Sequence, residues 1–173
     1  PMIAGTITLD QSVLAFKETA GKLGPLRAVA TSGPCDVDSE YGGVSFYGIH
    51  QVEMVCNLLG LEPVEVATVR HGADAIGTLT FAGGPVVTFA LLKDLWAPGF
   101  TAFAYGEQGA HYAELPFDQK MYLAGIRTFC TMFETKQEPL PPTAYLRPVA
   151  ILEAMQQSLD SGKSVKVMPV PAF

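Results

Sequence analysis

The chain is poor in charge. Only 16% of its 173 residues are charged, against about a quarter in an average soluble domain, and the net charge is −6. Lysine and arginine are scattered and never form a stripe beside aromatic residues, so we expect no nucleic-acid partner. No run approaches the roughly 20 apolar residues that a membrane-spanning helix needs, so we expect no membrane partner either.

Cysteine is also scarce. Cys35, Cys56 and Cys130 are odd in number and lie far apart, which excludes a disulfide framework. His50 and Glu53 have the spacing of half a metal site, but no third ligand follows at a useful distance, so we expect no metal. We expect free, buried thiols in a reducing cytoplasm.

A cofactor-binding motif is missing as well. No G-x-G-x-x-G follows a strand, and no acidic residue stands downstream of such a motif in a β-α-β unit. We therefore expect no nucleotide cofactor to bind to this chain alone.

The apolar content is high, at 49% of the residues. The length suits one domain, residues 1–173, with a sizeable core. Low charge with high apolar content suggests that a sheet face is buried against another subunit, giving a homo-oligomer. An ordinary apolar core explains the same composition equally well.

Short apolar runs separated by turn signals dominate the middle of the chain. They predict strands over Leu26–Ser32, Val64–Arg70, Ile76–Phe81, Val86–Leu92, Thr101–Tyr105, Tyr112–Leu115 and Val165–Val167. Helical spacing predicts helices over Leu9–Leu23, from about Val44 to Gly60, over Asp118–Phe133 and from Thr143 to Gly162. Short glycine turns favour antiparallel pairing. The pattern predicts an α+β fold, an open and mostly antiparallel sheet with helices packed on one face.

The helix that carries His50 holds the best candidate residues. Ile49, Val52, Cys56 and Leu59 recur at helical spacing, and Phe46, His50, Glu53 and Asn57 form a neighbouring stripe. His50 thus stands near a helix N-terminus, where free N–H groups favour a neutral imidazole that accepts a proton.

Candidate binding residues lie around this helix and at two strand ends. Tyr41 and Tyr47 carry hydroxyl donors for a substrate. Arg70, at the end of a predicted strand, is a candidate clamp for an anionic group. Trp96 stands on a predicted loop between strands, where site-rimming residues often occur.

The same segment resembles a motif of the glucose-fructose oxidoreductase, inositol dehydrogenase and rhizopine catabolism (Gfo/Idh/MocA) family. Gly42 and Gly43 match its leading glycines. Gly48 and His50 match the glycine and the histidine of its D-x-G-x-H-x-x-D pattern. Phe46 and Glu53 stand where the family has aspartates. Two further segments agree: Gly21–Gly24 resembles the G-x-[IL]-G turn, and Leu146–Val167 the closing A-x-x-x-S-x-x-x-G-x-x-V pattern.

The resemblance implies a fold and a function. It implies the C-terminal substrate-binding and oligomerisation domain of an NAD- or NADP-dependent oxidoreductase that acts on a sugar- or polyol-like small molecule. His50 would transfer the proton, and Phe46, Glu53 and their aromatic neighbours would line the substrate site. The nucleotide-binding domain would be missing or separate, together with the Glu-Lys-Pro motif and its catalytic lysine, so the isolated chain is not expected to be active.

Two alternatives remain open. The chain is also consistent with a free-standing, non-catalytic scaffold or partner subunit of the same fold. An unblocked N-terminal proline acts as a base in tautomerases, and the chain begins with Pro1-Met2, but it lacks the short repeat of that family.

Overall fold

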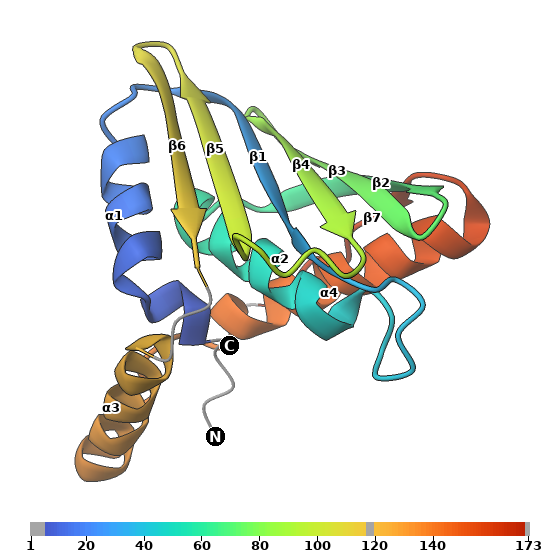
Figure 1. Ribbon diagram of the computed structural model, residues 1–173. Coiled ribbons are helices and arrows are strands. Elements are labelled where there is room, and N and C mark those ends of the chain that lie inside the picture. Colours follow the sequence, from blue (N-terminus) through green and yellow to red (C-terminus); the bar gives the residue numbers. More distant parts are fainter. Residues whose placement is uncertain (1–5, 117–119, 172–173) are drawn as a thin grey trace.

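The computed structural model describes residues 6–116 and 120–171. It confirms an α+β architecture built on a 7-stranded open sheet in the order β6-β5-β1-β4-β3-β2-β7 (Figure 1). The elements are η1 (Thr6–Leu9), α1 (Gln11–Ala20), β1 (Leu26–Pro34), α2 (Ser45–Leu59), β2 (Pro63–His71), β3 (Asp74–Phe81), β4 (Val86–Leu92), β5 (Phe100–Gly106), β6 (Gly109–Leu115), α3 (Lys120–Thr135), α4 (Thr143–Ser161) and β7 (Val165–Lys166).

The sheet is antiparallel except at its centre. β1 runs parallel to β4 and antiparallel to β5, so the first strand of the chain separates two strands that follow each other in sequence. Val29 of β1 lies opposite Val87 of β4 and Ala104 of β5. The carboxyl ends of β1 and β4 therefore meet at one edge of the sheet.

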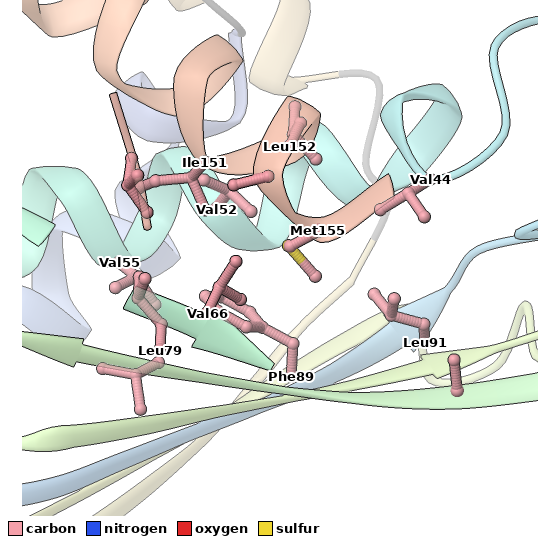
Figure 2. Packing of buried hydrophobic residues seen from close by; sticks show 14 of the residues in the cluster. Val44, Val52, Val55, Val66, Leu79, Phe89, Leu91, Ile151, Leu152 and Met155 are labelled. Carbon is pink, nitrogen blue, oxygen red and sulfur yellow. The ribbon is translucent and has the colours of Figure 1, made fainter. Parts of the chain in front are cut away.

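Alternation along the strands creates one apolar face. In β4, Val87, Phe89 and Leu91 are buried, whereas the residues between them face the other way. Helices α2 and α4 cover this face, and Figure 2 shows Met155 of α4 directed toward Phe89. Burying a side chain of this size contributes about 1.5–3 kcal/mol relative to leaving it exposed.

Left-handed glycines end the two covering helices. α2 stops at Gly60 with φ 64° and α4 at Gly162 with φ 67°. Glycine adopts this left-handed conformation without strain because it has no Cβ. Ser158 of the closing motif is buried: its hydroxyl accepts from the Thr68 amide at 2.8 Å and donates to the Lys163 carbonyl at 2.7 Å. The serine thus joins α4 to β2.

Helix α3 differs from the other helices. It packs against η1 and stands away from the sheet (Figure 1). One of its faces carries large apolar side chains that are between 45% and 64% exposed, namely Tyr122, Leu123, Ile126, Phe129 and Phe133. Such an uncovered stripe is typical of a helix that packs against something further.

The structure confirms the predicted elements with small shifts at their ends, and it corrects two details. Phe46 and Tyr47 have non-helical backbone angles inside α2, so Phe46 does not continue the stripe of His50. Of the three cysteines expected to be buried, Cys35 is buried, Cys56 is partly buried and Cys130 is exposed. Pro1 and Asp118 lie outside the described residues. None of the described helices has the length and apolar character needed to cross a membrane.

Candidate functional site

The glycine pair brings the chain into α2 along a narrow path. Gly42 and Gly43 have φ values of 124° and 55°, which side-chain-bearing residues rarely adopt. A Cβ on Gly43 would lie 2.6 Å from the Gln156 side-chain oxygen, the same oxygen that accepts from the Val44 amide at 3.3 Å. The glycines are therefore needed because the turn presses against α4.

A break in α2 then turns an aromatic side chain outward. Phe46 has an extended backbone, and Tyr47 has φ 75° and ψ −34°. A left-handed conformation costs a tyrosine roughly 1–2 kcal/mol, and such strain is concentrated at functional sites. Asp94, after β4, is a second non-glycine residue with positive φ, at 59°. Both strained residues line the same cavity.

This cavity, called the aromatic pocket below, has a volume of about 210 Å³. It opens between the loop after β1, the broken start of α2 and the loop after β4. Its lining residues are Cys35, Asp36, Ser39, Tyr41, Phe46, Tyr47, Asp94 and Trp96.

The aromatic wall is one connected cluster. Phe46 and Tyr47 meet edge to face at 4.8 Å between ring centroids, and Tyr47 meets Trp96 edge to face at 4.9 Å. Tyr41 lies 5.3 Å from Phe46 and is 73% exposed, and Trp96 is 53% exposed. Exposed aromatic rings around a hollow are suited to stacking against a ligand.

His50 lies behind this wall, not on it. Its ring packs edge to face between Tyr47, at 5.7 Å, and Phe100, at 5.6 Å. Burial lowers the pKa of His50, so the imidazole is neutral near pH 7. Phe100 is fixed in turn by Gly33, because a Cβ there would lie 2.0 Å from its ring. The histidine is held rigidly, with Tyr47 between it and the cavity.

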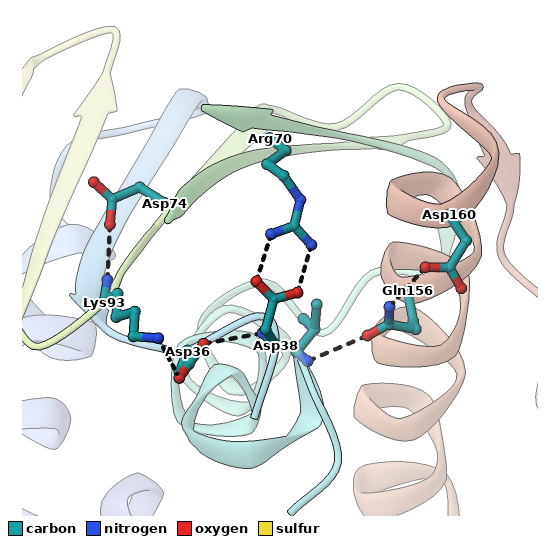
Figure 3. Close-up of polar contacts among 8 residues, drawn as sticks. Asp36, Asp38, Arg70, Asp74, Lys93, Gln156 and Asp160 are labelled. Carbon is teal, nitrogen blue, oxygen red and sulfur yellow. Dashed lines mark hydrogen bonds and ion pairs between the residues drawn. The ribbon is translucent and has the colours of Figure 1, made fainter. Parts of the chain in front are cut away.

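Ion pairs fix the loop that forms one side of the pocket. Asp38 accepts from both Arg70 guanidinium nitrogens at 2.7 and 2.8 Å, and Lys93 lies 2.9 Å from Asp36 (Figure 3). The Lys93 amide donates to Asp74 at 2.8 Å. Hydrogen bonding to Lys93 lowers the pKa of Asp36, and bonding to Arg70 lowers that of Asp38. These exposed pairs position the loop more than they stabilise the fold.

The structure brings together four of the residues singled out from the sequence. Tyr41, Phe46, Tyr47 and Trp96 all line the pocket, with His50 directly behind them. Glu53 does not: it points into the protein and is only 8% exposed. Arg70 does not line the pocket either, because its guanidinium binds Asp38.

Sequence reasoning missed Cys35, Asp36, Ser39 and Asp94. A signal was present, because Asp36 follows β1 and Asp94 follows β4, and ligands gather where parallel strands end. Finding it required knowing that β1 and β4 pair in parallel. Burial raises the pKa of the Cys35 thiol to about 11, so it lines the pocket as a neutral group and not as a nucleophile.

Comparison with known proteins places this fold. No protein-family model and no curated protein sequence matches the chain. Among solved structures, myo-inositol 2-dehydrogenase from Lactobacillus plantarum matches with a TM-score of 0.79 at 14% identity, over 95% of this chain and 64% of that one. A probable dehydrogenase from Thermotoga maritima matches with 0.77 at 17% identity, over 94% and 63%.

A third match contains ligands. Myo-inositol dehydrogenase from Lactobacillus casei, in complex with NAD(H) and myo-inositol, matches with a TM-score of 0.73 at 14% identity, over 98% of this chain and 62% of that one. The chain thus spans less than two thirds of the length of these dehydrogenases. It has the fold of their C-terminal domain, which confirms at the level of fold the resemblance to the Gfo/Idh/MocA oxidoreductases.

Proposed function

We propose that this chain is the substrate-binding and oligomerisation domain of an NAD- or NADP-dependent oxidoreductase acting on a hydroxyl or carbonyl group of a sugar- or polyol-like molecule. The observation that carries the proposal is the aromatic pocket with a neutral, rigidly held histidine behind its wall. The solved complex with NAD(H) and myo-inositol, on the same fold, supports the choice of cofactor and substrate class.

Each part of the pocket has a role in this proposal. The rings of Tyr47 and Trp96 stack against the apolar face of a sugar ring. Tyr41, Ser39 and Asp36 supply hydroxyl and carboxylate groups for the substrate hydroxyls. His50 accepts a proton from the substrate hydroxyl in oxidation and returns it to the carbonyl oxygen in reduction, after a small movement of Tyr47.

The cofactor does not fit the residues described. The pocket includes Asp36 and Asp94, whose carboxylates repel a pyrophosphate, and no G-x-G-x-x-G motif follows a strand along residues 6–116 and 120–171. We therefore assign the cofactor to a nucleotide-binding domain or subunit. The bare apolar stripe of α3 supports such a partner, because it is a surface that a second domain would cover.

We also propose that the open face of the sheet joins two copies of the chain. Across the central strands this face is made of small, β-branched and aromatic residues, including Ala30, Ile76, Thr88, Phe103 and Tyr105. A broad, weakly charged face of this kind suits a self-complementary interface.

The free thiols of Cys35 and Cys56 are consistent with the cytoplasm.

The test of the catalytic proposal uses the complete two-domain or two-subunit enzyme. His50→Asn should lower kcat about 100-fold or more while circular dichroism remains unchanged. His111→Asn is the matched control, because that imidazole stacks on Phe16 of α1 and does not line the pocket. An unchanged kcat in folded His50→Asn would overturn the assignment.

A non-catalytic scaffold or partner subunit is the second candidate. The observation that favours it is the position of His50 behind Tyr47 instead of on the cavity wall. Titration of this chain with NAD(H) and NADP(H) should give no binding heat under either function. A full open reading frame with no nucleotide-binding region, and no partner that carries one, would favour the scaffold.

A further inference from the structure

Charge around the aromatic pocket is unevenly distributed. Asp36 and Asp94 line the cavity, and within the described part of the chain no lysine or arginine does. The nearby cations are already held: Lys93 pairs with Asp36 at 2.9 Å, and Arg70 is bound by Asp38. An anionic ligand would have to break one of these ion pairs before it found a cation.

The carboxylate best placed for a ligand is that of Asp94. Lys93 forms an ion pair with Asp36, whereas Asp94, the next residue in an exposed turn, is attracted to Lys93 by charge without such a pair. Its backbone φ of 59° is unusual for a residue other than glycine, and Asp94 lines the cavity together with Trp96. Carboxylates are acceptor-only when ionised, so Asp94 suits a ligand that carries several donors.

The aromatic wall, like Asp94, favours a positively charged group on the ligand. The face of a tyrosine or tryptophan ring is electrostatically negative and attracts a cation within about 6 Å. Tyr47 and Trp96 pack together at 4.9 Å and both line the pocket with Asp94. A ring face that this edge-to-face contact leaves uncovered attracts the same positively charged group on a ligand as the Asp94 carboxylate does.

We propose that the aromatic pocket selects an amine-bearing sugar or polyol over its neutral counterpart, with the ammonium group between Asp94 and the aromatic wall, and that it rejects sugar acids and sugar phosphates. This inference rests on the proposed function for the site and adds the charge of the substrate. Ser39 and Tyr41, which also line the cavity, bind the hydroxyls of the same ligand.

The experiment titrates the isotope-labelled chain with four probes while amide NMR shifts are recorded. The probes are glucosamine, N-acetylglucosamine, glucose and glucuronate, at a pH where the amine is protonated. Glucosamine should bind about fivefold or more tightly than glucose, at signals of Tyr47, Asp94 and Trp96. N-acetylglucosamine, which lacks the charge, should bind no better than glucose, and glucuronate should bind more weakly still.

Two variants separate local from general charge effects. Asp94→Asn should abolish the preference for glucosamine and keep the turn, because asparagine also tolerates positive φ. Glu134→Gln removes the same charge from α3, away from the pocket, and should leave the preference intact. Circular dichroism checks that both variants fold.

The outcomes are distinct for the two proposals. Equal binding of glucose and glucosamine at the pocket overturns the charge selection and leaves the sugar-binding function standing. The same holds if Glu134→Gln removes the preference as fully as Asp94→Asn, or if glucuronate binds tightest. If none of the four probes shifts the pocket signals, both the charge selection and the proposed substrate class fail.

Discussion

The two faces of the sheet differ in composition and in what covers them, although the same strands contribute to both. The covered face presents Val29, Leu79, Phe89 and Leu91, all almost inaccessible and packed under α2 and α4. The open face presents residues one position away along the same strands, including Thr88 and Phe103. The first face has the large and varied apolar side chains of a core, whereas the second carries more alanine and threonine.

This contrast separates folding from assembly. The covered face already has its partner within the chain, so its side chains determine whether the domain folds. Within the described chain no helix covers the open face in a comparable way. Its exposed apolar side chains would be stabilised by burial against a partner. Substitutions on the two faces should therefore be visible in different measurements.

The largest difference is expected for a pair of phenylalanines. Phe89→Ala on the covered face should lower the free energy of unfolding by about 3–5 kcal/mol, because it leaves a cavity under Met155. Phe103→Ala on the open face should lower it by less than about 1 kcal/mol at concentrations where the chain is monomeric. Urea unfolding of both variants measures the contrast, and equal losses would remove the distinction between the faces.

Assembly should respond in the opposite way. Thr88→Lys places a charge at the centre of the open face, where Thr88 lies between Thr78 and Ala30. It should weaken self-association by about tenfold or more, because a buried lysine must lose its hydration. Light scattering over a concentration series gives the result. The control is Leu14→Lys on the exposed side of α1, which adds the same charge but should leave the oligomer unchanged.

A smaller effect is expected at the end of the sheet where the pocket lies. Tyr47→Ala and Tyr47→Gly both remove the ring, but only glycine relieves the strain at φ 75°. The glycine variant should therefore be more stable by about 1 kcal/mol, the reverse of the usual order inside a helix. Thermal unfolding compares the two. If alanine were the more stable, Tyr47 would not be strained, and its conformation would carry no functional meaning.

The smallest expected effect concerns pH. Burial lowers the folded-state pKa of His50 below the usual histidine value of about 6.5, so near and below that pH the unfolded chain binds more protons than the folded one. Stability contributed by this group is thus present above pH 6.5 and falls as the pH drops. The melting temperature of the native chain should fall more between about pH 7 and about pH 5 than that of His50→Asn. His71→Asn, which removes an exposed imidazole, is the control.

Much of the fold was predictable because its signals are local. The alternation in Val86–Leu92 and the stop at Gly60 depend on neighbouring residues only, and both were confirmed. The insertion of β1 between β4 and β5 was not predictable in this way, since nothing near Leu26 records which distant strand it will join. The break at Phe46 and Tyr47 also escaped, because a helical pattern continues through it.

The same distinction between local and distant signals applies to the candidate site. His50 and its aromatic neighbours belong to one continuous segment, so a motif found them. Asp36 and Asp94 lie far apart in sequence and meet only because β1 and β4 end together. From the sequence, Arg70 was a reasonable candidate to bind an anionic group of a ligand. In the fold its guanidinium pairs with Asp38. Charges at strand ends can be assigned to a ligand or to the protein only after the topology is known.

The central position of β1 has a consequence for how the chain reaches its native state. β1 is synthesised before the strands with which it pairs, which begin at Val86 and Phe100, so both of its edges remain unpaired until these distant segments have been made. Contacts so distant in sequence raise the contact order and slow folding. A nascent or truncated chain that ends before Gly106 exposes an apolar strand edge open to aggregation. Expression at low temperature, or with a chaperone that shields early strands, should therefore raise the yield of folded protein.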